Sequence, residues 1–228
     1  MKLLYKGKTK DVYYKNEREV LLAFKDDVTG EDGVFDPGAN TVGLSIDGAG
    51  MSALKMTTYF FERLKNINIP THYIESDIKK ATMTVKNAKM FGNGLEVICR
   101  FKAVGSFHRR YGAYCDEGKS LDAFTEVTLK DDERNDPPIS EDALVQLGIL
   151  TKVEYDTLIK WTKEVSTFVK TELEKKSLEL YDIKLEFGYD KESKQMMLID
   201  EISGGNMRVY QNGSYVEPLK LEQLFLNE

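Results

Sequence analysis

Polar and apolar residues alternate along residues 181–188, which read Tyr-Asp-Ile-Lys-Leu-Glu-Phe-Gly. The two-residue period of a β-strand places Asp182, Lys184 and Glu186 on one face and three apolar side chains on the other. The segment 190–194 contains no apolar residue and is followed by a second apolar run. The pattern therefore predicts a β-hairpin with its turn at 190–194, one face charged and the other apolar.

The register of this hairpin decides which way Asp200 points. Pairing even-numbered with even-numbered residues places Asp200 opposite or diagonal to Glu186, whereas a one-residue slip would place it among apolar side chains. Facing carboxylates repel each other unless a cation lies between them, and a divalent ion that carries phosphate is a common solution in ATP sites. The pattern alone leaves two interpretations in balance: a magnesium–nucleotide site, or the solvated face of an ordinary hairpin.

Residues 3–14 carry two apolar runs around a Gly-Lys-Thr-Lys centre, which predicts another hairpin. Its glycine would let the backbone approach a phosphate group, and Lys8 and Lys10 would meet the phosphate charge. The same residues are also typical of a hairpin tip with exposed lysines, so both interpretations stay open. The glycine-rich segment 26–50 has few large apolar residues and is predicted to be a long binding loop.

Apolar residues recur with a helical period in three segments, which are 51–66, 151–176 and 217–226. Thr151 and Glu154 have the spacing of a capping box, so the second helix is predicted to begin at Thr151. The apolar stripes of these helices are interpreted as core.

Residues 81–86 alternate small or apolar with polar residues and predict a strand that carries Lys86. A lysine on such a strand reaches ATP phosphates in several folds, and a surface lysine is the alternative. Residues 100–112 place four lysines and arginines together in an acidic chain. Gly105 and Ser106 are predicted to form a turn into a helix, where backbone N–H groups, the Ser106 hydroxyl and guanidinium groups would bind a phosphate. A solvated basic turn is the alternative.

The chain has 228 residues, 41% hydrophobic and 31% charged, as expected for a globular protein of one large domain or two lobes. Its formal net charge of -6 argues against general binding to nucleic acids or anionic membranes. No apolar run approaches the ~20 residues of a membrane span and no signal-peptide pattern opens the chain, so a cytoplasmic location is expected. Cys99 and Cys115 suggest no disulfide framework or metal spacing, and His72 and His108 are too few for a histidine-based zinc site.

Taken in order, several segments of the chain resemble the SAICAR synthetase family. They are 5–13, 96–100 with Gly105 and Ser106, 130–132 with 136–137, 182–188, and 200–203 with Arg208. The resemblance implies an α/β (α+β) fold of two lobes. A small kinase-like antiparallel β lobe, residues 1–92, would bind the nucleotide, and a larger lobe related to ATP-grasp enzymes, residues 93–228, would carry the metal and substrate sites.

The resemblance also implies an ATP-dependent ligase of purine biosynthesis, which joins L-aspartate to the carboxylate of carboxyaminoimidazole ribotide and releases ADP and phosphate. The implied path is phosphorylation of that carboxylate, followed by attack of the aspartate amine. Carried over by position, the resemblance assigns the ATP phosphates to Lys8, Lys10 and Lys86, and Mg²⁺ to Glu186 and Asp200. It assigns the ribotide to Arg100, Ser106 and Arg208. It also implies that Asp182 and Lys184 lie near the reacting groups. Catalysis would consist of positioning and charge neutralisation, without a protein nucleophile.

Four positions depart from the usual pattern of that family. Ala49 and Ala53 stand where lysine and asparagine are usual, Phe101 where asparagine is usual, and Gly205 where aspartate is usual. The sequence also ends before a final long helix that many members carry. Two alternatives stay open: a ligase or phosphotransferase of the same fold that acts on another phosphorylated small molecule, and a nucleotide-binding regulatory module. A homodimer is a further expectation from the family.

Overall fold

The computed structural model describes residues 1–31, 34–35 and 41–227, and the chain divides into two compact units. The first unit comprises Met1–Lys89, Gly188–Asn206 and Glu217–Glu228, and the second comprises Met90–Phe187 and Met207–Val216. A lobe boundary at residue 92 stays a prediction. Within the described ranges, no helix is long and apolar enough to cross a membrane.

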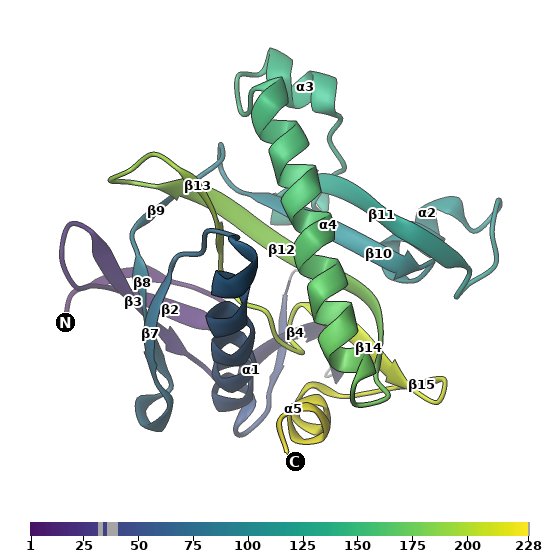
Figure 1. Cartoon of the computed structure of the whole chain (residues 1–228), viewed down its shortest axis with the longest axis horizontal. Helices are drawn as coiled ribbons and strands as arrows, with labels where there is room; N and C mark the ends of the chain where they lie inside the picture. Colours follow the sequence, from purple (N-terminus) through teal and green to yellow (C-terminus); the bar gives the residue numbers. More distant parts are fainter. Residues whose placement is uncertain (32–33, 36–40, 228) are drawn as a thin grey trace. The chain divides into compact units, whose positions relative to one another are not determined.

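An antiparallel five-stranded sheet forms the centre of the first unit (Figure 1). In sheet order its strands are β1 (Leu3–Lys6), β2 (Lys10–Tyr14), β3 (Glu19–Phe24), β8 (Thr82–Lys86) and β7 (Tyr73–Asp77). The predicted hairpin at 3–14 is confirmed as β1 and β2, and the predicted strand at 81–86 as β8. The tip of the first hairpin needs glycine, because a Cβ at Gly7 would lie 2.2 Å from the Lys10 carbonyl oxygen.

Helix α1 (Ala49–Leu64) packs its apolar stripe against this sheet and continues as a short 3-10 turn, η1 (Lys65–Ile67). This confirms the helix predicted at 51–66. A second short turn, η2 (Ile78–Lys80), links β7 to β8. The C-terminal helix α5 (Pro218–Leu226) packs on α1, where the rings of Phe60 and Phe225 stack with centroids 5.2 Å apart. The predicted helix at 217–226 therefore closes the core of this unit.

The segment 26–50 was predicted to be a loop, and that prediction is wrong for most of its described part. It forms a small sheet of β4 (Asp27–Glu31), β5 (Val34–Phe35) and β6 (Val42–Ser45). A Cβ at Gly43 would lie 2.5 Å from the carbonyl carbon of Gly30, so glycine permits a close backbone approach between β4 and β6. Residues 32–33 and 36–40 of the predicted loop lie outside the described residues.

The second unit is built on a larger antiparallel sheet. Its strands, in order, are β11 (Ser120–Leu129), β10 (Leu95–Lys102), β12 (Glu179–Asp190), β14 (Met207–Gln211) and β15 (Ser214–Tyr215). Strands β9 (Ala88–Met90) and β13 (Met196–Ile199) also pair with β12, whose last residues, 188–190, belong to the first unit. The predicted hairpin is confirmed as β12 and β13, since Asp190 N–H donates to the Gln195 carbonyl at 2.9 Å across the turn.

Helix α4 (Lys152–Glu174) packs on β10 and β11 and is the longest helix of the unit (Figure 1). The predicted capping box is present, because Glu154 N–H donates to Thr151 Oγ1 while Thr151 N–H donates to the Glu154 carboxylate. The buried stripe includes Leu158, Val165 and Leu173, as predicted. Shorter helical segments are α2 (Gly105–Tyr111), η3 (Asp132–Arg134) and α3 (Glu141–Gln146).

Candidate active site

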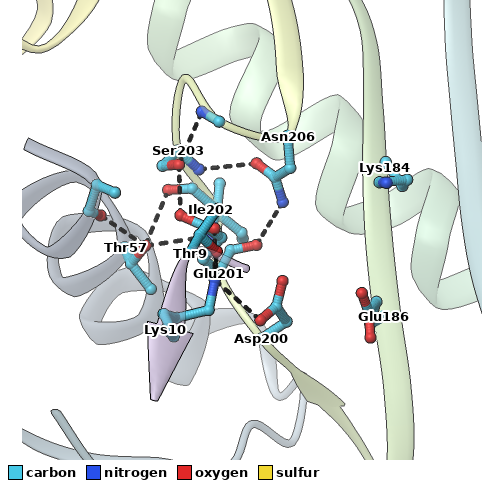
Figure 2. A network of polar contacts seen from close by, with 12 residues as sticks. Thr9, Lys10, Thr57, Lys184, Glu186, Asp200, Glu201, Ile202, Ser203 and Asn206 are labelled. Carbon is cyan, nitrogen blue, oxygen red and sulfur yellow. Dashed lines mark hydrogen bonds and ion pairs between the residues drawn. The ribbon is translucent and has the colours of Figure 1, made fainter. Parts of the chain in front are cut away.

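Lys10 and Glu201, both buried, form a charged cluster with the half-buried Asp200 in the first unit (Figure 2). Lys10 is the first residue of β2, and the two acids directly follow the last residue of β13. Lys10 Nζ donates to Glu201 Oε1 at 2.5 Å and lies 3.1 Å from Asp200 Oδ1. Burial alone would lower the pKa of Lys10, but the two carboxylates outweigh burial and raise it. Lys10 is therefore a buried, permanently charged ammonium group.

Asp200 has a left-handed backbone with φ 65°. Strand β13 ends at Ile199, so strand alternation does not direct the Asp200 side chain. The predicted direction of the Asp200 side chain relied on strand register. That reasoning is wrong, because Asp200 is a turn residue and not a strand residue. Glu186 belongs to the second unit, and its pairing with Asp200 around a metal ion stays a prediction.

A tight turn over residues 201–206 fixes the Glu201 carboxylate (Figure 2). Ser203 Oγ donates to Glu201 Oε2 at 2.6 Å. Asn206 braces the same turn twice, because its Nδ2 donates to the Glu201 carbonyl at 2.6 Å and its Oδ1 accepts from Ser203 N–H at 2.9 Å. Thr57 on α1 adds an anchor, since its Oγ1 accepts from the Ile202 N–H at 3.3 Å. Side-chain hydrogen bonds, rather than strand geometry, hold this acidic segment in place.

His72 also contacts this segment. Its Nε2 lies 3.2 Å from the carbonyl oxygen of Asp200. Burial lowers the pKa of His72 to about 4, although the nearby Asp200 carboxylate acts in the opposite direction. The imidazole is therefore uncharged at neutral pH.

The other two predicted phosphate-binding lysines occupy different surroundings. Lys8 is partly buried in the turn between β1 and β2. Lys86 ends β8, its side chain is 46% exposed, and its Nζ lies 3.8 Å from Asp190 Oδ2. Lys10 thus differs from Lys86 in being buried and in direct contact with Asp200.

A pocket in the first unit adjoins the charged cluster. Its lining includes residues of the β1–β2 turn, β3, β4, β5, α1, the turn after β13 and the start of α5, among them Glu201 and Ser203. Three of the four positions that depart from the family pattern, Ala49, Ala53 and Gly205, also line this pocket. The fourth, Phe101, belongs to the second unit. The absence of larger side chains at these three positions leaves space beside Glu201.

In the second unit, a row of charges crosses three neighbouring strands. Arg100 on β10 pairs in register with Asp182 on β12, which pairs in register with Arg208 on β14. Asp182 Oδ2 accepts from Arg100 Nη1 at 2.7 Å and from Arg208 Nη1 at 2.8 Å. Regular strand pairing thus brings together three predicted site residues, with one carboxylate between two guanidinium groups.

Further acceptors surround Arg100, which is only 1% exposed. Its Nη2 donates to Ser106 Oγ at 2.8 Å, and its Nε donates to Glu126 Oε1 at 3.0 Å. The other Glu126 oxygen accepts from Arg110. Each Arg100 guanidinium nitrogen therefore has an acceptor within the protein. The side chain of Arg208 is 15% exposed, so it is the more accessible guanidinium group of the row.

Two ion pairs lie farther along the same strands. Lys184 Nζ on β12 donates to Glu96 Oε1 on β10 at 2.7 Å. Lys130 Nζ donates to Glu186 Oε1 at 2.5 Å. Burial would lower the pKa of Lys184, but Glu96 and, more weakly, Glu186 raise it. Lys184 is therefore held in charged form by its carboxylate partner, and the buried Glu186 has Lys130 as an ion-pair partner.

The sequence interpretation missed several residues that contact the predicted site residues or the turn that follows Asp200. They are His72, Glu96, Glu126, Lys130, Glu201 and Asn206. Strand alternation could have found Glu96, since it lies four residues before Arg100 on the same face of a strand. Nothing in the local pattern marks Asn206, which acts through a turn. In the described part of the chain, no group of three or more His, Cys, Asp or Glu side chains is arranged to hold a metal ion.

Comparisons with known proteins cover nearly the whole chain. The family model described as SAICAR synthetase matches residues 3–224. A phosphoribosylaminoimidazole-succinocarboxamide synthase of Clostridium tetani is 64% identical over 226 residues, which are 99% of this chain and 100% of that protein. A solved structure described as a SAICAR synthetase has a TM-score of 0.79 at 36% identity, covering 92% of this chain and 86% of its own. A SAICAR synthetase in complex with ADP has a TM-score of 0.80 at 29% identity, covering 93% and 87%.

Proposed function

The chain belongs to the SAICAR synthetase family, and from that premise we propose that it joins L-aspartate to the carboxylate of carboxyaminoimidazole ribotide, using ATP. The products of this step of purine biosynthesis are SAICAR, ADP and phosphate. Identity of 64% over the full length of the Clostridium tetani protein supports this proposal. The structural observation that carries it is the charged Lys10 in contact with Asp200 at the end of the β12–β13 hairpin.

The ATP phosphates are proposed to bind Lys10, Lys8 and Lys86. Lys10 suits this role because it stays charged at any physiological pH and a buried ammonium group interacts strongly with phosphate oxygens. The ADP bound to the related solved structure supports a nucleotide site in the fold.

Asp200 and Glu186 are the proposed Mg²⁺ ligands. Their carboxylate oxygens are the donors that this hard cation prefers, and Mg²⁺ commonly uses one or two protein carboxylates together with phosphate oxygens and water. A bound magnesium ion would neutralise the charge that develops on the transferred phosphoryl group. The protein's part is to hold the two carboxylates, and Lys10 and Lys130 lie within ion-pair distance of them.

The ribotide is proposed to bind at the arginine row of the second unit. Arg100, Arg110 and Arg208 carry three positive charges against the two of Asp182 and Glu126, so the group keeps an excess positive charge. Ser106 lies at the first turn of α2, where its hydroxyl is already oriented by Arg100. Such a group suits a phosphorylated, carboxylated substrate.

Lys184 is proposed to lie near the reacting carboxylate. A carboxylate is a poor electrophile, so one of its oxygens must first be phosphorylated, and the aspartate amine then displaces phosphate to form the amide. Lys184 remains charged beside Glu96 and would stabilise the negative charge that gathers on the carboxylate oxygens. No side chain of the protein has to act as a nucleophile.

The test is ADP release by the purified protein with MgATP, the carboxylated ribotide and L-aspartate, each omitted in turn. We expect ADP release to require all three, and SAICAR to form in equal amount. Turnover that continues without aspartate, or with another phosphorylated acceptor in preference to the ribotide, would overturn the proposal in favour of a related phosphotransferase. Tight ATP binding without turnover would favour a regulatory module instead.

Three further expectations belong to the same proposal. We propose a cytoplasmic location, a homodimer, and a nucleotide-binding N-terminal lobe that ends near residue 92. Light scattering of the purified protein tests the dimer, fractionation of the source cells tests the location, and limited proteolysis around residue 92 tests the boundary.

A further inference from the structure

His72 is held rigidly by its own backbone and by a neighbouring ring. Its N–H donates to the Leu198 carbonyl on β13 at 2.9 Å, and its carbonyl accepts from Lys86 N–H on β8 at 2.7 Å. The imidazole packs edge-on against Phe61 of α1, with centroids 5.6 Å apart. The residue is 3% exposed. The ring therefore has a fixed position relative to β13 and to Lys86.

From this position the ring reaches past the end of β13 to Asp200. Its Nε2 lies 3.2 Å from the Asp200 carbonyl oxygen, which can only accept a hydrogen bond. The proton must therefore be on Nε2.

This contact falls on a residue with a left-handed backbone conformation. A left-handed conformation is uncommon outside glycine and persists where the surroundings hold it. The turn that follows is braced on the Glu201 side by Ser203 and Asn206. On the Asp200 side, the His72 side chain contacts the backbone carbonyl of Asp200.

We propose that His72 is a positioning residue for Asp200: its Nε2–H holds the left-handed peptide that aims the Asp200 carboxylate at Lys10. This rests on the proposed function, in which Asp200 binds the magnesium ion of MgATP. His72 touches neither substrate nor metal and acts through the Asp200 carbonyl. Its backbone bond to Lys86 also ties two predicted nucleotide-binding segments to one residue.

The first test compares His72→Leu, which has no donor, with His72→Gln, whose side-chain amide can donate from a similar distance. Loss of a partner that orients a metal ligand commonly costs about 10–100-fold in metal affinity or activity. We expect His72→Leu to lower kcat by about that factor and to raise the magnesium concentration needed for half-maximal rate. We expect His72→Gln to recover most of both.

Phe61→Leu is the matched control, because it disturbs the packing of the same ring without removing a donor. Assayed well below its Tm, it should keep the magnesium dependence of the wild type. Equal activity of His72→Leu and His72→Gln would overturn the proposal. So would a magnesium dependence that shifts as much in Phe61→Leu as in His72→Leu.

The second test does not depend on activity, because the ring is observed in the wild-type protein and a variant is needed only to assign its signal. ¹⁵N NMR of the histidine rings of the wild-type protein at neutral pH should show a proton on Nε2 of His72. The chain has only two histidines, so the signal is assigned by its loss in His72→Gln. An Nε2 that carries no proton, as in the Nδ1–H tautomer, would overturn the proposal. An inactive wild-type protein would instead refute the proposed function and leave this measurement to decide the hydrogen bond.

Discussion

The two charged groups of this protein are built in different ways. In the second unit, Arg100, Asp182 and Arg208 occupy paired positions on three regular strands. In the first unit, Lys10 begins a strand, while Asp200 and Glu201 follow one. Strand register positions the first set, and side-chain hydrogen bonds to turns position the second.

This difference has a physical consequence for the two groups. A charge on a central strand cannot move without breaking the backbone ladder, so its neighbours mainly serve to neutralise it. A charge on a turn keeps its direction only while the hydrogen bonds of that turn persist. We therefore expect substitutions around the strand-borne row to reduce stability first, and substitutions around the turn to reduce activity first.

The largest expected effect is on turnover, and it involves one carboxylate from each unit. Asp200→Asn and Glu186→Gln should each lower kcat by about 1000-fold or more, because each removes a charge proposed to bind the metal ion. The fold should persist, as judged by far-ultraviolet circular dichroism and Tm. Activity close to that of the wild type in either variant would remove that residue from the metal site.

The next largest effect is on the stability of the strand-borne row. Glu126→Ala leaves Arg100 buried without one of its acceptors, which should lower the free energy of unfolding by about 3 kcal/mol. Urea denaturation measures this change. Glu174→Ala is the control, because Glu174 pairs with Lys170 on the exposed side of α4 and should cost less than about 1 kcal/mol. Equal costs for the two variants would contradict the importance of burial here.

Ser203→Ala tests the turn-borne cluster and should have a smaller effect on stability. It removes the donor to Glu201 Oε2 and the acceptor for Gly205 N–H, at a cost of about 1–2 kcal/mol. Because Glu201 then loses its orientation beside Lys10, KM for ATP should rise about tenfold, which corresponds to about 1.4 kcal/mol. Steady-state kinetics measures this change. Thr157→Ala, which removes an exposed hydroxyl on α4, is the control.

An unchanged KM for ATP in Ser203→Ala would mean that Lys10 alone orients Glu201. In that case the turn would keep the direction of its charges without one of its hydrogen bonds, as the strand-borne row does. The distinction between the two units would in that case be one of location and not of mechanism.

The same difference explains what the sequence could predict. Alternation along residues 181–188 predicted the hairpin and the shared face of Asp182, Lys184 and Glu186, because a two-residue period is a property of local sequence. The capping box at Thr151 predicted the start of α4 for a similar reason. The fold class and the family followed from several such segments in the correct order, and the comparisons confirm them.

The missed features depend on contacts between residues distant in sequence. The direction of Asp200 follows from a left-handed turn and from His72, 128 positions away. The strands β4 and β6 were taken for a loop because glycine, which usually marks loops, here permits two backbones to approach each other. Neither effect leaves a periodic signal in the residues concerned.

The smallest expected effect concerns Cys99, in the core of the second unit. Burial raises the pKa of its thiol, so the unfolded chain loses this proton at a lower pH than the native protein does. The contribution of Cys99 to stability is therefore complete below the ordinary thiol pKa and decreases as pH rises toward the raised value.

Between about pH 7.5 and pH 9.5, the free energy of unfolding should fall more in the wild type than in Cys99→Ala. Cys115→Ala, measured by the same urea denaturation, should follow the wild type, because Cys115 lies outside the buried core. The pH dependence could instead be identical in the wild type and Cys99→Ala. That result would show that the second unit opens enough to solvate its core thiol, contrary to the rigidity inferred from its strand register.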